Sequence, residues 1–505
     1  MENESKCLWK WNRNYQLHVI VSTNKSEYTD ESVVYMEDLE KRKKAYGICG
    51  ECNKPGTGKE WCQPCNAKRL KDNFKNWTSG NEIIDEFIQQ SQLDAVCYLN
   101  YVEWIPIEKF QNITYIAEGG FGKVYSAEWP EGHIECWDIE NKIWRRCRNS
   151  KYALKSVNNS SDISSDFLNE IKSHLQIYLN TVVICYGITQ DPNTKEYIMV
   201  LQYCENGNLR NYLCKSENYI DYKTKIDALQ HLAGGLLDIH NAGLVHKDLH
   251  SGNILHAVPR LFISDLGLCQ PANKQSVKEE GFYGVLPYMA PEVLRGHQYT
   301  KAADIYSFGI IMNEFLSGKV PFSDIPHDEV LAVEICNGFR PNISKDVPKL
   351  LVNLITKCWD TEIENRPTAI KLYQLLRKWH VEIRNINDSE NEEDGKNSEI
   401  YSQVKECNEI RGKEFESTSS KDKFENNQTH PQAIYTSRLL NFKNLPQLAN
   451  SSNLLSFQFN SGKFNLFTFV FKLNMGLVIP NTKILQFRIR AELCITPANF
   501  WNSGF

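Results

Sequence analysis

Residues 246–253 read His-Lys-Asp-Leu-His-Ser-Gly-Asn and residues 264–267 read Ser-Asp-Leu-Gly, and these two stretches decide the fold. Their two carboxylates, Asp248 and Asp265, are separated by two short apolar runs, which predict a hairpin of buried strands. Phosphoryl transfer needs such an arrangement, because one carboxylate accepts the hydroxyl proton while the second holds Mg²⁺ against the phosphates. A carboxamide oxygen such as that of Asn253 completes the magnesium site, since hard cations prefer oxygen ligands.

Four further motifs surround these stretches. Upstream lie Ala-Glu-Gly-Gly-Phe-Gly-Lys-Val at residues 117–124, Ala-Leu-Lys at residues 153–155 and the single acidic residue Glu170. Downstream lies Ala-Pro-Glu at residues 290–292. Each motif alone is weak evidence, but together they follow the order of the protein-kinase signature set. Residues from about 105 to 380 therefore resemble a protein kinase catalytic domain.

The resemblance implies an α+β fold of two lobes, a small β-rich N-lobe and a large helical C-lobe. It also implies that ATP and Mg²⁺ bind in the cleft between the lobes and that proteins are the substrates. Asp248 would act as the catalytic base, and Asn253 and Asp265 would bind Mg²⁺. Lys155, held by Glu170, would contact the α- and β-phosphates.

The remaining nucleotide-binding positions follow from the same resemblance. Val124 and Ala153 would enclose the adenine ring, and Leu201 would be the gatekeeper beside it. Backbone groups around Gln202 and Cys204 would bind the adenine edge. Glycines let backbone N–H groups approach phosphate oxygens because no Cβ stands in the way. The positions of this phosphate-binding loop are Ala117, Gly119, Gly120 and Gly122.

A cluster of cysteines precedes the kinase-like region. Cys49 and Cys52 form one C-x-x-C pair, and Cys62 and Cys65 form a second after a short loop that carries Gly and Pro. Two such pairs predict a closed, structural Zn²⁺ site of four thiolates in a small zinc-knuckle module. The alternatives are a redox dithiol and a pair of disulfides.

Four substitutions relative to the kinase pattern bear on activity. Ala117 replaces the first glycine of the loop, His250 stands where most serine/threonine kinases place a lysine, and Val285 stands where they place a threonine. Lys247 replaces the arginine of the His-Arg-Asp motif, and lysine cannot bind a phosphate through two parallel hydrogen bonds as arginine does. These differences leave the preferred acceptor hydroxyl open.

Two functional interpretations remain. The first is an ATP-dependent protein kinase of intracellular signalling, with serine and threonine favoured as acceptors and dual specificity as an alternative. The second is a catalytically inactive scaffold that binds partners through the kinase fold and the zinc knuckles. Trp359, seven residues before Arg366, resembles the tyrosine-kinase-like or tyrosine kinase branches. The combination with a cysteine module resembles a fungal expansion of tyrosine-kinase-like kinases.

The overall composition is ordinary for a globular protein. The 505 residues are 41% hydrophobic and carry a net charge of −5, so no basic footprint for nucleic acid is apparent. Nucleic-acid binding by the cysteine module is a weaker third interpretation that rests on Lys59, Lys68, Arg69 and Lys71. Without a secretory signal, the 16 cysteines are expected to be reduced thiols in the cytoplasm, with the nucleus as an alternative. Lys463 and Lys472 interrupt the apolar stretch from Leu454 to Ile479, and its longest uncharged piece falls short of the roughly 18 residues of a membrane span.

Shifts in composition predict the domain boundaries. A helical bridge with an apolar stripe at Ile83, Ile84, Phe87 and Ile88, capped by Ser79 or Asn81, should connect the cysteine module to the kinase domain. An insertion at residues 130–150 is expected to be a two-stranded flap. The predicted segments are a weakly ordered N-terminus (1–45) with a short helix near 35–44, the zinc-knuckle module and bridge (46–100), the kinase domain (101–383), an acidic disordered linker (384–429), and a C-terminal tail of unknown role (430–505) with a short docking element at 430–447.

Overall fold

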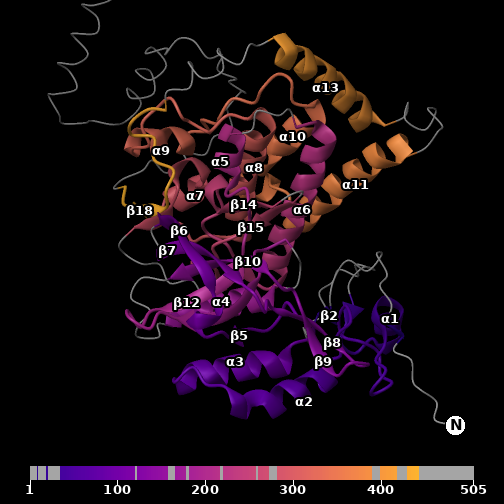
Figure 1. The fold of residues 1–505 in the computed structure, drawn as a ribbon. Helices are drawn as coiled ribbons and strands as arrows, with labels where there is room; N and C mark the ends of the chain where they lie inside the picture. The colour runs from indigo at the N-terminus through magenta and orange to yellow at the C-terminus, as the bar shows by residue number, and fades with distance from the viewer. Residues whose placement is uncertain are drawn as a thin grey trace, which may run out of the picture. The chain divides into compact units, whose positions relative to one another are not determined.

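The computed structural model describes most of one compact unit, residues 1–447. The described residues are 8–9, 19–20, 34–119, 122–156, 165–177, 181–215, 220–257, 260–271, 281–388, 398–417 and 429–442. Along the chain they form a small cysteine module, a lobe built on a six-stranded sheet, and a larger helical lobe (Figure 1). The predicted α+β fold of two lobes after a cysteine module is therefore confirmed.

The sheet of the N-lobe has the strand order β5-β11-β12-β10-β7-β6. Its neighbouring strands pair antiparallel, except for β5 and β11, which are parallel. Helix α4 (Ser165–Gln176) packs on the sheet because Phe167 and Ile171, four residues apart on one face, are buried in one cluster with Met199. The strands are β5 (Glu103–Trp104), β6 (Gln111–Gly119), β7 (Gly122–Trp129), β10 (Ser150–Ser156), β11 (Cys185–Gln190) and β12 (Tyr197–Gln202).

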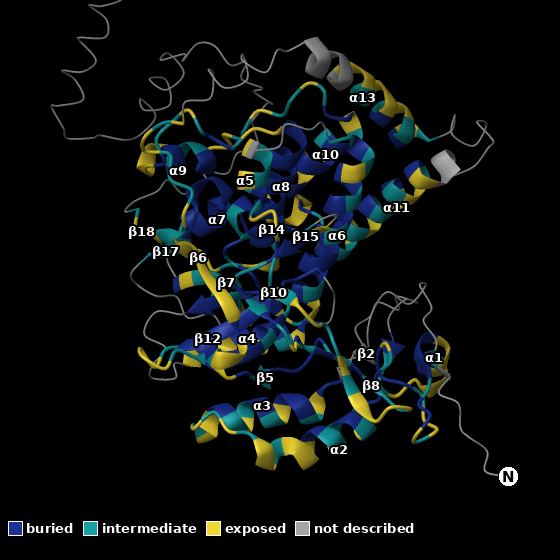
Figure 2. Cartoon of the chain, viewed as in Figure 1, coloured by how far each residue is buried: buried dark blue, intermediate teal, exposed yellow. Residues whose placement is uncertain are grey.

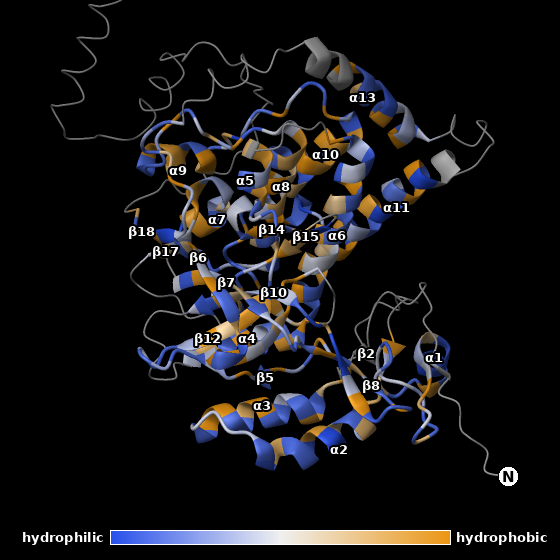
Figure 3. Cartoon of the chain, viewed as in Figure 1, coloured by the Kyte–Doolittle hydropathy of each residue, from blue (hydrophilic) through white to orange (hydrophobic). Residues whose placement is uncertain are grey.

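Helix α8 (Lys301–Ser317) forms the centre of the C-lobe. All its residues from Ala303 to Ser317 are buried (Figure 2), and most of them are apolar (Figure 3). The Thr300 side chain caps the helix by accepting a hydrogen bond from Ala303 N, and the helix ends at Gly318, whose φ of 70° favours glycine. The other helices of this lobe are α5 (Leu209–Lys215), α6 (Tyr222–Asn241), α7 (Pro291–Leu294), α9 (Glu329–Cys336), α10 (Lys349–Cys358) and α11 (Ala369–Asp388).

The hairpin predicted between the two acidic motifs is present. Strand β14 (Ile254–Ala257) pairs antiparallel with β15 (Arg260–Ile263), and Ile254 lies opposite Ile263. The hairpin starts directly after Asn253 and ends directly before Ser264 and Asp265. The open end of one small hairpin therefore holds both motifs close together.

The helical bridge consists of α2 (Gln63–Asn73) and α3 (Glu82–Asp94). The Asn81 side chain caps α3 by accepting hydrogen bonds from Ile83 N and Ile84 N, as one of the two predicted caps. Ile84 and Ile88 are fully buried in the same hydrophobic cluster as Phe167 and Ile171 of α4. Ile84 and Ile88 of the predicted stripe are thus core and pack against the N-lobe, whereas Ile83 is exposed.

The part of the N-terminal segment that the structure describes contains helix α1 (Leu39–Tyr46), followed by β4 (Gly47–Ile48). Ala45 and Tyr46 are buried in a small cluster with Val96. The short helix expected near residues 35–44 is therefore present as α1, and it packs on the residues that follow α3.

The insertion at residues 130–150 forms the predicted two-stranded flap. Strand β8 (Ile134–Asp138) pairs with β9 (Ile143–Arg146), which places Trp137 opposite Trp144. The Trp144 ring stacks on Trp61 of the cysteine module at 6.0 Å between ring centroids, and Arg145 forms an ion pair with Glu60. The flap therefore connects the cysteine module to the N-lobe.

The expected disordered linker, residues 384–429, is wrong in two places. Helix α11 continues to Asp388, and residues 399–417 form helix α13 (Glu399–Ser417). Ile400 and Val404 of α13 are buried in the core of the C-lobe. Two apolar residues four positions apart are enough to dock this polar helix, although its composition suggests disorder.

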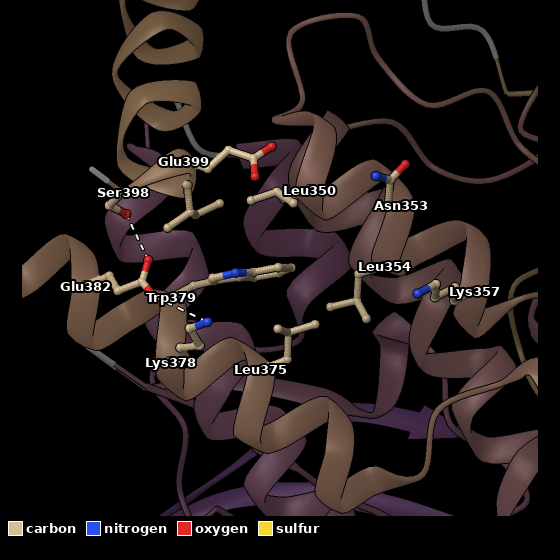
Figure 4. A pocket seen from close by; sticks show the side chains of 11 residues that line it. Leu350, Asn353, Leu354, Lys357, Leu375, Lys378, Trp379, Glu382, Ser398 and Glu399 are labelled. Atoms are coloured by element: carbon tan, nitrogen blue, oxygen red, sulfur yellow. Dashed lines mark hydrogen bonds and ion pairs between the residues drawn. The ribbon is translucent and has the colours of Figure 1, made fainter. Parts of the chain in front are cut away.

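A hollow of about 640 Å³ lies between α10, α11 and the start of α13. Trp379 lies across it, with Leu350, Leu354 and Leu375 on neighbouring helices, and Ser398 donates a hydrogen bond to Glu382 at its rim (Figure 4). The hollow shares no lining residue with the kinase motifs. Among the described residues, no helix combines the length and the apolar character needed to cross a membrane.

Candidate active site

The predicted phosphate-binding loop is the turn between β6 and β7. Gly119 pairs with Gly122, and Ala117 pairs with Val124 further along the hairpin. Gly122 has a φ of 148°, a backbone conformation that L side chains rarely adopt. Gly120 lies outside the described residues, so its predicted role stays a prediction. On the other side of β7, Val124 pairs with Lys155 of β10, which places the loop next to the predicted catalytic lysine.

Lys155 joins the two lobes at the centre of the site. Its Nζ lies 2.8 Å from Glu170 Oε1 on α4 and 3.0 Å from Asp265 Oδ1 after β15. All three side chains are largely buried. Burial alone would lower the pKa of Lys155, but the carboxylates of Asp265 and Glu170 outweigh burial and raise it. The lysine is therefore cationic and held in place to meet an anionic ligand.

Asp304 of α8 holds the backbone of the catalytic loop in place. Its carboxylate accepts hydrogen bonds from the backbone N–H groups of His246 at 2.9 Å and Lys247 at 3.1 Å. Lys247 has a φ of 71°, an uncommon backbone conformation for a residue with a side chain. The Asp304 hydrogen bonds thus hold the strained turn that presents Asp248.

Asp248 and Asn253 are in direct contact. The Asn253 amide Nδ2 donates to the Asp248 carbonyl at 2.9 Å and lies 3.2 Å from Asp248 Oδ2. This leaves the Asn253 carboxamide oxygen as the group available to a cation. Asp265, across the hairpin, offers a carboxylate, so the two predicted magnesium ligands supply the oxygen donors that Mg²⁺ takes.

The carboxylate of Asp248 is buried beside two polar side chains. Ser437 Oγ donates to Asp248 Oδ2 at 2.5 Å, and His250 Nε2 lies 3.5 Å from the same oxygen. Within the described part of the chain, Asp248 Oδ1 has no hydrogen-bond partner. Burial alone would raise the pKa of Asp248, but His250 and Ser437 outweigh burial and lower it below its ordinary value. The group is therefore an ionised proton acceptor at neutral pH.

The residues expected around adenine lie together. Ala153 of β10 pairs with Leu201 of β12, and both contribute to one hydrophobic cluster. Leu255 of β14 packs against the same cluster from the other lobe, a contact that the sequence analysis missed. The Gln202 N–H donates to Ile184 O at 2.9 Å within the N-lobe. Cys204 is buried, and burial raises the pKa of its thiol to about 12, so it is a neutral thiol.

One ion pair and one hydrogen bond of the C-lobe hold the segment that follows the catalytic loop. Arg366 meets Glu292 through two hydrogen bonds of 2.7 and 2.8 Å. Lys247, which replaces an arginine, donates to Gln270 Oε1 at 2.6 Å.

The four cysteines of the predicted metal site converge. The Sγ atoms of Cys49, Cys52, Cys62 and Cys65 all lie within 4.8 Å of one another. Tetrahedral zinc with Zn–S bonds of about 2.3 Å has thiolates about 3.8 Å apart. The distances of 4.0 Å from Cys49 to Cys65 and 3.5 Å from Cys52 to Cys62 fit such a set.

One of the four basic residues near the cysteine cluster, Arg69, has a structural role. Arg69 forms an ion pair with Glu51 and lies over the Trp137 ring at 4.3 Å from its centroid. Arg69 is thus occupied in packing the module against the flap. The contacts give no support to the interpretation of these residues as a nucleic-acid surface.

The fold and the site together define a member of the protein kinase class. A lysine paired with a helix carboxylate and with the carboxylate after the hairpin lies where the two lobes meet, and a loop carboxylate contacts an asparagine at the start of the same hairpin. The family model for protein tyrosine and serine/threonine kinases matches residues 110–376. The chain belongs to this family.

Individual relatives agree with this family and include both acceptor types. The chain is 27% identical over 279 residues to serine/threonine-protein kinase VIK of Arabidopsis thaliana, covering 53% of this chain and 60% of the relative. It is 27% identical over 290 residues to human tyrosine-protein kinase TXK, covering 57% of this chain and 51% of the relative. A putative serine/threonine-protein kinase/receptor of Acanthamoeba polyphaga mimivirus is 33% identical over 270 residues, covering 52% of this chain and 15% of the relative.

Each alignment spans less than two thirds of the relative, so the likeness concerns the kinase domain. These relatives come from a plant, a human and a virus, and they give no support to the fungal subgroup.

Proposed function

We propose that this chain is an ATP-dependent protein kinase that transfers the γ-phosphoryl group to a protein hydroxyl, with serine and threonine favoured over tyrosine. The observation that carries this proposal is the bonding of Lys155 Nζ to both Glu170 and Asp265. Active kinases need this lysine–glutamate pair and the hairpin aspartate in place at the same time. Both conditions are met by the described residues.

The roles of the side chains follow from this geometry. Lys155 would bind the α- and β-phosphates, and Asp248 would accept the proton of the acceptor hydroxyl. Bound by Asn253 and Asp265, Mg²⁺ would neutralise charge on the phosphates. Relatives that act on serine and threonine and a relative that acts on tyrosine both match, which supports a place in the tyrosine-kinase-like branch.

A catalytically inactive scaffold is the competing function, and it is favoured by Ala117, His250 and Val285. The two are separated by measuring incorporation of radiolabelled phosphate into a mixed protein acceptor by the full chain and by Asp248→Asn. Loss of a general base lowers the rate by about 10²- to 10⁴-fold, so the variant should be nearly inactive. Equal, near-zero incorporation by two folded proteins with the same melting temperature would establish the scaffold.

For the cysteine module, we propose a structural zinc site of four thiolates. The four sulfur atoms fill all positions of a tetrahedron, which leaves no open position for catalysis. The cluster lies between α1, α2 and the flap, where the described segments are short and share few apolar residues. The metal would stabilise a segment that is too small to fold by itself.

A further inference from the structure

Residues 429–442 of the C-terminal tail lie along the C-lobe and end at the catalytic site. Strand β18 (Arg438–Leu440) pairs antiparallel with β17 (Phe282–Gly284), so that Gly284 lies opposite Arg438 and Phe282 opposite Leu440. Strand β17 belongs to the segment between Asp265 and the Ala-Pro-Glu motif at residues 290–292. The tail is thus bound as an added strand in extended conformation, a common way for a protein to hold a peptide.

The residues before β18 are bound by side chains of the C-lobe. The Tyr435 ring lies under Arg210, 4.2 Å from the guanidinium carbon to the ring centroid, and its hydroxyl donates to Pro321 O at 2.8 Å. His327 N donates to Gln432 O at 3.0 Å, and the His327 ring meets Tyr435 edge-on at 4.7 Å between centroids. Backbone and aromatic contacts therefore fix the tail on both sides of residues 436 and 437.

These contacts place Ser437 beside the catalytic loop. Its hydroxyl lies 2.5 Å from Asp248 Oδ2 and 3.1 Å from His250 Nε2. The neighbouring hydroxyl residue, Thr436, is exposed. One side chain of the tail thus occupies the position where the proposed base meets an acceptor hydroxyl.

We propose that Ser437 is a phosphorylation site that the kinase modifies within its own chain, with residues 430–440 bound as a built-in peptide substrate. This inference rests on the proposed kinase function. In the reaction, the Ser437 Oγ–H proton passes to Asp248 and a new bond forms between Oγ and the γ-phosphorus of ATP. The bond from that phosphorus to the β,γ-bridging oxygen breaks, and ADP leaves.

The product differs from the reactant in its charge. A phosphoserine carries about −1.5 to −2 charge at neutral pH, and it would stand beside the Asp248 carboxylate. Repulsion between like charges weakens the contact of the tail with the catalytic loop. The modification therefore frees the acceptor position for other proteins that present a serine in an extended segment.

The test uses the full chain with ATP, Mg²⁺ and a mixed protein acceptor in one reaction. Phosphate on Ser437 is quantified by mass spectrometry, and phosphate on the acceptor is counted separately. Wild type and the matched control Thr436→Ala should both carry phosphate on Ser437, and Ser437→Ala should lose that signal. The rate of Ser437 modification per molecule should not change when the enzyme is diluted.

A second arm mixes wild type with the inactive Asp248→Asn chain, whose own Ser437 should stay unmodified. Labelled acceptor with unmodified Ser437 would overturn the inference and leave the proposed function intact. Modification of the inactive chain at a rate that rises with enzyme concentration would also overturn it, because transfer would then occur between chains. No label on either the acceptor or Ser437 would overturn the kinase function itself.

Discussion

Lys155 Nζ and Glu170 Oε1 are joined by a hydrogen bond of 2.8 Å. The two residues belong to β10 and α4, so the bond forms only when the helix is docked on the sheet. Ile84 and Ile88 of α3 share one hydrophobic cluster with Phe167 and Ile171 of α4. The catalytic pair therefore depends on the packing of a helix that lies outside the residues matched by the kinase family model.

Replacing Lys155 by Met should abolish most phosphoryl transfer. The change removes the cation that faces the phosphates and leaves the buried carboxylates of Glu170 and Asp265 without their partner. Loss of one such electrostatic contact lowers kcat by about 10²- to 10³-fold. Initial rates with a protein acceptor measure the effect. The matched control is Lys151→Met, an exposed lysine on the same strand, and a similar loss there would contradict the assignment.

Replacing Ile84 by Ala should destabilise the N-lobe, whereas the same change at Ile83 should not. Ile84 of α3 is fully buried, and its neighbour Ile83 is 57% exposed. An Ile→Ala change in a core costs about 2–5 kcal/mol, and surface changes usually stay within about 0.5 kcal/mol. Denaturant titration gives the two free energies of unfolding. Equal values for the two variants would show that α3 does not pack as described.

Removing the metal site should lower the catalytic rate indirectly, because the site supports helices that pack on the N-lobe. Cys62→Ser breaks the four-thiolate set, loosens α2 and α3, and so withdraws support from α4. Indirect coupling of this kind is worth about 0.5–2 kcal/mol, or about a two- to thirtyfold lower rate. Metal content by mass spectrometry and kcat are measured on one sample. Cys214→Ser, an exposed thiol outside the cluster, serves as the control.

Replacing His250 by Ala should shift the pH dependence of kcat. Burial raises the pKa of Asp248, while His250 lowers it, so removing His250 should move this pKa upward. A base with a lowered pKa stays ionised until the pH falls through that value, so wild type should keep its activity between pH 5 and 8. As the pH is lowered, the activity of His250→Ala should begin to decline at a higher pH than that of wild type. The control is His231→Ala on α6, and an unchanged acid limb in His250→Ala would contradict the prediction.

Replacing Tyr435 by Ala should release the tail. Tyr435 loses the contact with Arg210 and the hydrogen bond to Pro321 O, which together hold the residues before Ser437. A cation–π contact of this kind is worth about 0.5–2 kcal/mol, so Ser437 modification should slow about two- to thirtyfold. Activity toward a separate protein acceptor should rise at the same time. Leu439→Ala, which alters an exposed side chain on the same segment, should change neither rate.

The catalytic residues could be predicted from the sequence because each lies in a short motif of fixed chemistry. The structure brings Lys155 together with Glu170 and Asp265, since the order of the motifs fixes the fold, and the catalytic roles stay predictions. Leu255 was missed because an apolar residue in a strand gives no sign of which lobe it will face. The helix at 399–417 was missed for a similar reason, as Ile400 and Val404 alone interrupt a polar composition.

Ser437 could not have been identified from its neighbours in the sequence. The predicted docking element at residues 430–447 does contain the bound strand. The sequence Tyr-Thr-Ser-Arg, however, does not indicate which hydroxyl will contact Asp248. That choice depends on pairing with β17, and the pairing register is a tertiary property. Just before β18, Thr436 is exposed, whereas the Ser437 hydroxyl meets Asp248.

The pairing of β18 with β17 joins two parts of one polypeptide, so the bound peptide has an effective molarity instead of a solution concentration. Effective molarities for linked peptides reach about the millimolar range, well above the cellular level of most individual proteins. An external substrate must therefore compete with a ligand that cannot be diluted. The affinity of the tail for β17 would then set the concentration at which other proteins can bind at the catalytic loop. The abundance of the enzyme would not affect it.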